Sequence, residues 1–380
     1  MEKNGAGAIV APDGWLSTDQ PDLFFEDNPI GRMKHELWHA DDAAIDAVIA
    51  EYGHPAPVEW GLAGSYLQMM PRAQLLEERK RNDIVFLPIG CTENHGRHLP
   101  SATDTLFCSQ IVEGVRRYVK NRDGAPPALC LPPLNFGAHP YHHFGMPGTA
   151  IVRDDIVREA LIDVMLGLYN DGFRKIILVN NHGHLWVLES AIQQFVIRYQ
   201  LPGIFRVLDW HRSVREFFRE KKYGGEYDST FVHACEAETS FGLYLFPEMV
   251  DMAEAVDTEG KSYLPDGHFD KSVEPYRRPS RFSEGEGHFP IELSATPEGV
   301  VGLAAHGEAD KARRPLAAIL RYLTILHDDI LTAFPAGTVP PVEEVTLREE
   351  KDMLPFLLEP QSPGWKSVYA LPSIGQSTTY

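Results

Sequence analysis

The 380-residue chain carries 35 Lys and Arg against 54 Asp and Glu, so its formal net charge is −19 with histidine neutral. This balance excludes nucleic acid and anionic membrane surfaces as expected partners, because a phosphate-binding surface needs a basic face. Hydrophobic residues at 43% and charged residues at 23% are typical of a globular protein with a sizeable core. The apolar runs are far shorter than the ~20 residues of a membrane-spanning helix, so a soluble protein is expected.

The cellular compartment is predicted from the cysteines and from the first residues. Four cysteines lie far apart, and none belongs to a CxxC pair. The N-terminal residues lack a basic segment followed by an apolar one, so no secretory signal is visible. These features predict reduced thiols in a cytoplasmic protein.

Residues 1–82 show little regular pattern, although 41–51 and 73–80 fit short helices. This stretch is too short to build a large core of its own, yet it contains several large apolar side chains. We therefore expect an N-terminal extension that packs on the core or on a neighbouring subunit.

Residues 83–334 alternate short apolar runs with amphipathic stretches, which predicts an α/β domain. The predicted strands are 84–89, 128–131, 175–180 and 204–208, and apolar residues at every fourth position predict a helix in each interval. This order implies a mostly parallel sheet with helices on both faces. Residues 254–297 are expected to form a long loop or lid, 308–334 a helix, and 335–380 an extended C-terminal tail.

Histidines and acidic residues gather directly after two of the predicted strands. The segment after the first strand contains Glu93, His95 and Asp104, and the segment after the third contains His182 and His184. The carboxyl ends of parallel strands meet at one edge of a sheet, so these side chains are expected to converge. Carboxylate and imidazole ligands suit Zn, Mn or Fe, and a carboxylate shared by two ions would place a hydroxide between them.

Each of these residues also has a plain structural explanation when it is taken alone. Asp104 fits the N-cap of a helix, Glu93 a solvated loop carboxylate, and His182 a hydrogen-bonded turn histidine. Their joint occurrence at two strand ends favours the metal site. Motifs for nucleotide binding, zincins and serine hydrolases are missing from the sequence.

Two further blocks complete a resemblance to a known family. Gly90–Asp104 resembles the creatininase signature, Gly-Ser-x-Glu-Gln-His-Gly-x-His-Leu-Pro followed by Thr-Asp. His142–Thr149 (HHFGMPGT) and Val232–Ser240 (VHACEAETS) resemble two later blocks, and the histidine segment at His182 lies between them. Four blocks in the same order, spread over about residues 83–330, make the resemblance specific.

The resemblance implies a three-layer α/β hydrolase with two divalent metal ions per chain, often Zn or Mn, usually assembled as a homo-oligomer of six chains. Position by position, Glu93, His95, Asp104 and His182 match the metal ligands, and Asp104 matches the bridging one. His233 matches the histidine that moves the proton. Glu238 matches an active-site carboxylate that approaches a metal or holds His233.

The chain departs from creatininases at the expected substrate pocket. His184 stands where true creatininases carry a glutamate, so creatinine is a doubtful substrate and a structural role for His184 is equally open. His142 and His143 lie in a block at the pocket rim, and Glu236 adds a carboxylate beside Glu238. We expect His142, His143, His184 and Glu236 to contact the substrate.

These observations predict a metal-dependent hydrolase that opens a small cyclic substrate through attack of a metal-bridging hydroxide on a carbonyl. Long members of the family act on cyclic diketones of inositol breakdown, such as 3-dehydro-scyllo-inosose, which makes an oxygen-rich ring the first expectation. A cyclic amide, as in creatininase itself, is an alternative. A catalytically silent metal-binding scaffold is another, although a scaffold has no need of a proton-moving histidine.

Overall fold

The computed structural model describes residues 11–19, 23–51, 67–129, 134–139, 145–259 and 296–371. The chain divides into two compact units, Met1–Leu62 and Ala63–Tyr380. The predicted long loop at 254–297 lies mostly outside the described residues, as do His142 and His143. Among the described helices, none is long and apolar enough to cross a membrane.

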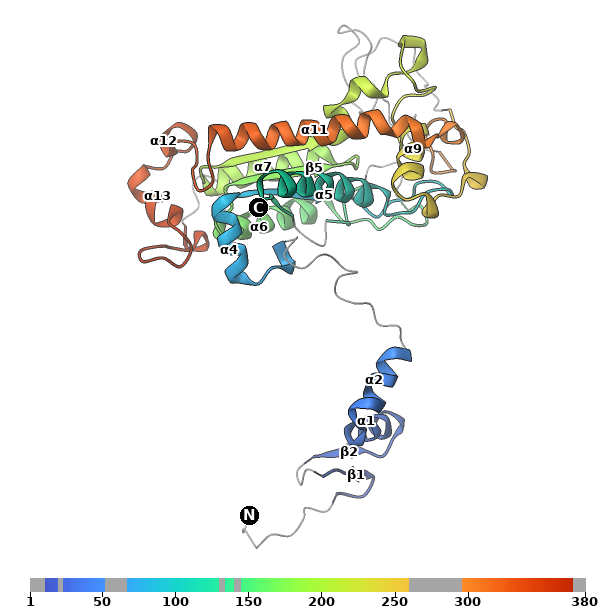
Figure 1. Ribbon diagram of the computed structural model, residues 1–380, viewed down its shortest axis with the longest axis vertical. Coiled ribbons are helices and arrows are strands. Elements are labelled where there is room, and N and C mark those ends of the chain that lie inside the picture. Colours follow the sequence, from blue (N-terminus) through green and yellow to red (C-terminus); the bar gives the residue numbers. More distant parts are fainter. Residues whose placement is uncertain are drawn as a thin grey trace. The chain divides into compact units, whose positions relative to one another are not determined.

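A four-stranded parallel sheet forms the centre of the larger unit, in the order β4-β3-β5-β6 (Figure 1). Its strands are β3 Ile84–Ile89, β4 Ala128–Leu129, β5 Lys175–Asn180 and β6 Ile204–Asp209. Ile84 pairs with Lys175, and Lys175 pairs with Ile204, so β3, β5 and β6 start and end at the same level. The predicted strands and their parallel arrangement are thereby confirmed.

Helices cover both faces of this sheet because successive strand side chains point to opposite sides. Ile84 and Phe86 pack with α5 Thr103–Asp123 and α11 Ala309–Ala333, whereas Val85 and Leu87 pack with α6 and α7. Figure 1 shows the long α11 running beside the sheet. The remaining core helices are α6 Asp154–Asn170, α7 Leu185–Tyr199 and α9 Glu236–Leu245.

Shorter helices complete the larger unit. They are η1 Leu67–Met69, α4 Arg72–Arg81, α8 Trp210–Ser213, η3 Arg215–Phe218, η4 Lys221–Tyr223, η5 Pro247–Met249, η6 Met252–Glu254 and η8 Ala304–His306. α4 falls within this unit, with Arg79 buried, although the sequence had placed it in the extension. The boundary between the units therefore lies about one helix earlier in the chain than expected.

The C-terminal region differs from the extended tail that the sequence suggested. It contains α12 Val342–Val345, α13 Glu350–Leu357 and η9 Val368–Ala370. Met353, Phe356 and Val368 are buried in the hydrophobic cluster formed by α6 and α7. Residues 335–371 are thus a packed part of the larger unit, held by these apolar side chains.

The N-terminal unit has its own small arrangement of elements. β1 Trp15–Ser17 pairs antiparallel with β2 Phe24–Glu26, and α1 Pro29–His39 and α2 Asp42–Glu51 follow. The Asn28 side chain caps α1 by accepting a hydrogen bond from the amide of Gly31. The expectation that this region packs on the core or on another subunit stays a prediction.

Candidate metal centre

The predicted metal ligands come together at the carboxyl ends of β3 and β5. Glu93 and His95 lie in the loop after β3, and that loop ends where α5 begins at Thr103, which places Asp104 in the first helical turn. His182 follows β5, and Glu238 comes from the first turn of α9. All five side chains are buried.

Two groups of possible ligands overlap at Asp104. In the first group, His182 Nδ1 lies 2.7 Å from Glu93 Oε2 and 3.1 Å from Asp104 Oδ2. In the second, His95 Nε2 lies 3.4 Å from Asp104 Oδ1 and 3.8 Å from Glu238 Oε2. Each group offers three ligand atoms, and each carboxylate oxygen of Asp104 faces one group.

Backbone carbonyls fix which ring nitrogen of each histidine faces the cluster. His95 Nδ1 donates a hydrogen bond to the carbonyl of Glu93 at 3.1 Å, so Nε2 points to the carboxylates. His182 Nε2 donates to the carbonyl of Ala138 at 2.9 Å, so in this ring Nδ1 is the nitrogen that points to the carboxylates. Metal-binding histidines are generally oriented by such hydrogen bonds from the second ring nitrogen.

Three buried atoms at the centre of this cluster have no hydrogen-bond partner: His95 Nε2, Asp104 Oδ2 and His182 Nδ1. Buried polar atoms without partners are rare because each one loses its interaction with water. Two imidazole nitrogens and a carboxylate oxygen are the ligand types that divalent transition metals accept. The residues present therefore fit the metal ions that the sequence predicted.

The electrostatics of the cluster also favour a cation. Burial lowers the pKa of the His95 imidazole, but Asp104 and then Glu238 outweigh burial and raise it to about 10. Burial raises the pKa of the Glu238 carboxyl to about 7, although His95 opposes this shift. For Asp104, His95 and His182 overcome the effect of burial and hold the pKa below its usual range. Closely packed carboxylates thus stabilise positive charge at this point.

Asn181 orients two of the carboxylates and was not singled out from the sequence. Its Nδ2 donates to Asp104 Oδ1 at 2.6 Å and to Glu238 Oε1 at 3.3 Å. Its Oδ1 accepts a hydrogen bond from Trp210 Nε1 at the end of β6. Its position directly before His182 indicates in the sequence that Asn181 lies near the site. Its contact with Trp210 could not be predicted, because Trp210 follows the neighbouring strand β6.

His233 lies against the same cluster. Its ring stacks obliquely on His95 with centroids 4.3 Å apart, and its Nε2 donates to the carbonyl of Asn94 at 2.6 Å. Its Nδ1 is 3.9 Å from Glu93 Oε2. The main-chain amide of Ala234 donates to Glu238 Oε2 at 2.5 Å, so the segment after His233 also holds this carboxylate.

The four residues expected to contact the substrate differ in their surroundings. His184 is fully buried, and its Nε2 donates to Asn180 Oδ1 at 3.1 Å. Glu236 is engaged elsewhere, by Lys311 Nζ at 2.6 Å and by the amides of Asp228 and Ser229. This buried ion pair gives Glu236 a structural role in place of the substrate contact that we expected. His142 and His143 lie outside the described residues.

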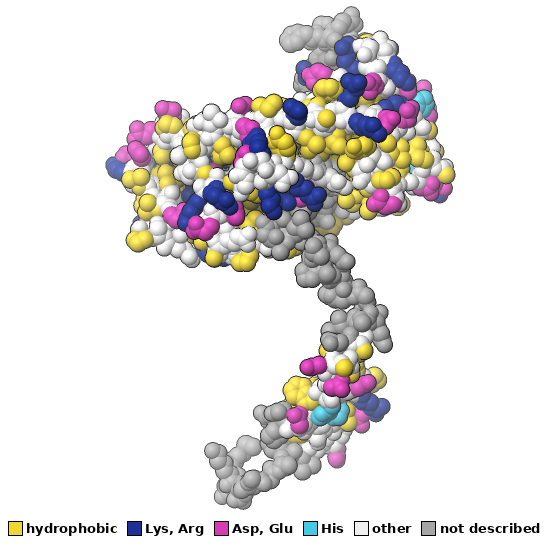
Figure 2. All heavy atoms as spheres, in the orientation of Figure 1, with side chains coloured by type: hydrophobic (Ala, Val, Ile, Leu, Met, Phe, Trp, Pro, Cys, Tyr) yellow, Lys and Arg dark blue, Asp and Glu magenta, His cyan; other side chains and the backbone are white. Residues whose placement is uncertain are grey.

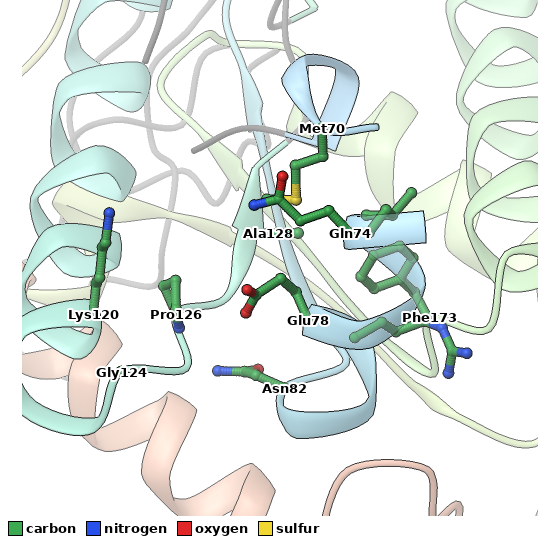
Figure 3. Close-up of a pocket in the computed structure, with 11 residues that line it drawn as sticks. Met70, Gln74, Glu78, Asn82, Lys120, Gly124, Pro126, Ala128 and Phe173 are labelled. Atoms are coloured by element: carbon green, nitrogen blue, oxygen red, sulfur yellow. The ribbon is translucent and has the colours of Figure 1, made fainter. Parts of the chain in front are cut away.

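A separate pocket lies at the other end of the strands from the ligand cluster (Figure 3). It has a volume of about 160 Å³ and is lined by Gln74, Glu78, Asn82 and Lys120, among others. Asn82 and Phe173 in its wall precede β3 and β5, so this pocket lies at the amino ends of the strands. Ligands of open α/β sheets bind at the carboxyl ends, where the metal cluster is found.

A parallel α/β sheet with a buried carboxylate and imidazole cluster at its carboxyl edge defines a metal-binding protein of the hydrolytic α/β class. The family model described as "Creatinine amidohydrolase" matches residues 68–326. The chain belongs to the creatininase family, and it is a metal-dependent hydrolase.

Named relatives support this assignment. A 3-dehydro-scyllo-inosose hydrolase from Thermotoga maritima is 40% identical over 80% of this chain and 96% of its own length. A creatinine amidohydrolase from Pseudomonas putida is 26% identical over 52% of this chain and 76% of its own length. A mycofactocin precursor peptide peptidase from Mycolicibacterium smegmatis is 34% identical over 31% of this chain and 46% of its own length.

Solved structures show the same fold. A creatinine amidohydrolase (creatininase) matches 71% of this chain and 98% of its own length with a TM-score of 0.52 at 19% identity. A protein from Bacteroides fragilis named as a creatinine amidohydrolase covers 71% of this chain and 97% of its own length, with a TM-score of 0.52 at 22% identity. The predicted creatininase-like α/β fold is confirmed.

Proposed function

We propose that this chain opens an oxygen-rich ring, a cyclic diketone such as 3-dehydro-scyllo-inosose, at a centre of two divalent metal ions. The proposed substrate rests on the 40% identity to the Thermotoga maritima hydrolase, which extends over nearly all of that relative. The observation that favours two ions is the pair of ligand groups that share Asp104.

Zn and Mn are the proposed ions. Glu93, Asp104 and His182 would hold one, and His95, Asp104 and Glu238 the other. Bound there, the ions would lower the pKa of water and polarise a carbonyl group. Solved creatininases include an Mn form and a variant of Zn-Zn type, which supports these two choices.

Residues around the proposed metal centre have two further roles, positioning the ligands and moving a proton. Asn181 holds Asp104 and Glu238 in place through its amide nitrogen. When a ring bond next to the attacked carbonyl breaks, the departing carbon needs a proton, and the second carbonyl of a diketone stabilises it until the proton arrives. We assign that transfer to His233: Nε2 bonds the carbonyl of Asn94, so Nδ1 is the atom that would take a proton from the attacking water and deliver it to the departing carbon.

The charge of the pocket favours this substrate over creatinine. Burial lowers the pKa of His184 well below its usual value, and the neighbouring His182 acts in the same direction. A neutral imidazole thus replaces the glutamate that creatininases carry at this position, which removes one negative charge that would attract a guanidinium-like group. His142, His143 and His184 remain the proposed substrate contacts, with His142 and His143 as donors to hydroxyl or carbonyl oxygens.

Hydrolysis in water enriched in heavy oxygen tests the reaction. We expect metal-loaded protein to convert the cyclic diketone into an open-chain acid that carries one labelled oxygen in its carboxylate, as read by mass spectrometry. Ring opening of creatinine alone would support the cyclic amide alternative. Lack of turnover on both rings would support the silent scaffold.

We also propose a cytoplasmic homo-oligomer, with a hexamer as the assembly. The described cysteines, Cys91, Cys108 and Cys235, are free and buried. Hydrophobic side chains gather over α11 in Figure 2, and a groove of about 430 Å³ between α5 and α11 carries the exposed Tyr118 and Ile325. Exposed apolar surface of this kind is common at subunit interfaces, and light scattering on the full chain measures the assembly.

A further inference from the structure

A thiol and two imidazoles lie together beside the carboxylate cluster. Cys91, His139 and His182 offer ligand atoms within 4.8 Å of one another. Cys91 follows β3, and its Sγ lies 3.2 Å from His139 Nε2. The rings of His139 and His182 have centroids 5.0 Å apart. The mechanism proposed above uses His182 but neither Cys91 nor His139.

Hydrogen bonds direct the lone pairs of this group inward. His139 Nδ1 donates to the carbonyl of Gly137 at 3.1 Å, so the lone pair of Nε2 faces Cys91 Sγ. His182 Nε2 donates to Ala138, so its single lone pair is on Nδ1. The three side chains thus present one sulfur and two nitrogen atoms, which soft metal ions prefer to the oxygen ligands of the neighbouring cluster.

Gly137 provides room for this group. A Cβ atom at this position would lie 3.1 Å from Cys91 Sγ and 2.7 Å from His184 Nδ1. His184 Nδ1 is itself fully buried without a hydrogen-bond partner. The Cys91 thiol and the unpartnered His184 nitrogen therefore both approach the backbone at Gly137 closely, where a larger residue would displace them.

We propose that Cys91, His139 and His182 form an alternative site for a thiophilic divalent ion such as Cd²⁺, which shares only His182 with the carboxylate positions. Binding releases the Cys91 proton to solvent, because the thiolate is the ligand form. The site and the Glu93, Asp104 and His182 position are mutually exclusive, since the one lone pair of His182 binds one ion at a time. Excess of a soft ion therefore displaces a hard ion from the carboxylate position.

Titration of the full Mn²⁺-loaded chain with Cd²⁺ tests the site. We expect a sulfur-to-cadmium charge-transfer absorption in the ultraviolet and release of about one Mn²⁺ for each Cd²⁺ bound, measured by electron paramagnetic resonance. Cys91→Ser should lose the band and His139→Ala should weaken Cd²⁺ binding at least tenfold. Cys235→Ala, which removes another fully buried thiol, should keep both signals.

Three results would overturn the proposal. The first is the lack of a band in the unmodified chain, and the second is an undiminished band in Cys91→Ser that folds, as judged by circular dichroism. The third is a band without Mn²⁺ release, which would show that His182 is not shared. The band does not depend on turnover, so a failure of the proposed ring opening leaves this test intact.

Discussion

Asp104 is the residue on which the account of the metal centre depends most. Its two carboxylate oxygens face two different histidines, and one of these oxygens is buried without a hydrogen-bond partner. The sequence placed Asp104 among the ligands, although such a residue taken alone is more often an N-cap. The fold argues against the N-cap role, because no side-chain cap is formed at the start of α5.

Replacing Asp104 by alanine should remove both ions, because both ligand groups lose a member. His95→Ala should lose mainly one ion, since only one of the two groups that share Asp104 contains it. Elemental analysis of protein reconstituted with Zn or Mn measures the number of ions per chain. His98→Ala is the matched control, because His98 is equally buried in the same loop but bonds Thr239. Two ions retained in Asp104→Ala would refute a shared carboxylate.

His233→Ala should keep its metal and lose turnover by roughly 10²- to 10⁴-fold, the usual contribution of a positioned acid or base. The ring lies against His95 but outside the two groups that share Asp104. Metal content and kcat are measured on the same preparation. If metal content falls in step with kcat, His233 is a ligand and the proton donor has to be sought elsewhere.

The strand ends and helix starts determine how the ligands meet. β3, β5 and β6 end level with one another, so Asn181 after β5 reaches both Asp104 on α5 and Trp210 at the start of α8. Such an arrangement depends on strand order, which explains why the sequence singled out the candidate ligands but not the residue that orients them. Strands β3 and β5 were predictable because their runs are mostly apolar and buried on both faces.

Asn181→Ala should weaken metal binding by roughly 10- to 100-fold, as is usual when a side chain that orients ligands is lost. Trp210→Phe removes the indole N–H that holds Asn181, together with one ring of a fully buried side chain, but leaves the Asn181 amide in place, so a smaller loss of affinity is expected from it. Competition with a fluorescent chelator measures both affinities. Wild-type affinity in Asn181→Ala would show that the carboxylates hold their positions unaided.

The C-terminal helices were missed because they are short and contain or follow proline, as at Pro341 and Pro355. Their packing rests on few side chains, of which Met353 is fully buried and Phe356 nearly so. The sequences of these two helices are too short to indicate which surface of the core they pack against. The contact with α6 and α7 becomes visible only in the folded chain.

Met353→Ala should lower the free energy of unfolding by about 2–5 kcal/mol, because it leaves a cavity in the core. The neighbouring Leu354 is 50% exposed, so Leu354→Ala is the control and should change stability by less than about 0.5 kcal/mol. Urea unfolding followed by circular dichroism measures both variants. Equal effects of the two substitutions would argue that α13 does not pack on the core.

For the whole molecule, the fold and the ligand positions could be predicted from ordered motifs, while the substrate pocket could not. Pocket walls come from loops whose course is not periodic, and Glu236 illustrates the difficulty. Its sequence neighbour Glu238 faces the metal cluster, yet Glu236 turns to Lys311 one helix away. Residues two positions apart on a helix face different directions. The ion pair with Lys311 on α11 shows that Glu236 is the structural one of the two carboxylates.

The central claim is that this creatininase-family hydrolase acts on an oxygen-rich ring in preference to creatinine. The most direct measurement is kcat/KM of the metal-loaded chain for 3-dehydro-scyllo-inosose and for creatinine under the same conditions, with chelated protein as the blank. We predict efficient turnover of the diketone and little or none of creatinine. Efficient creatinine turnover without activity on the diketone would contradict the claim.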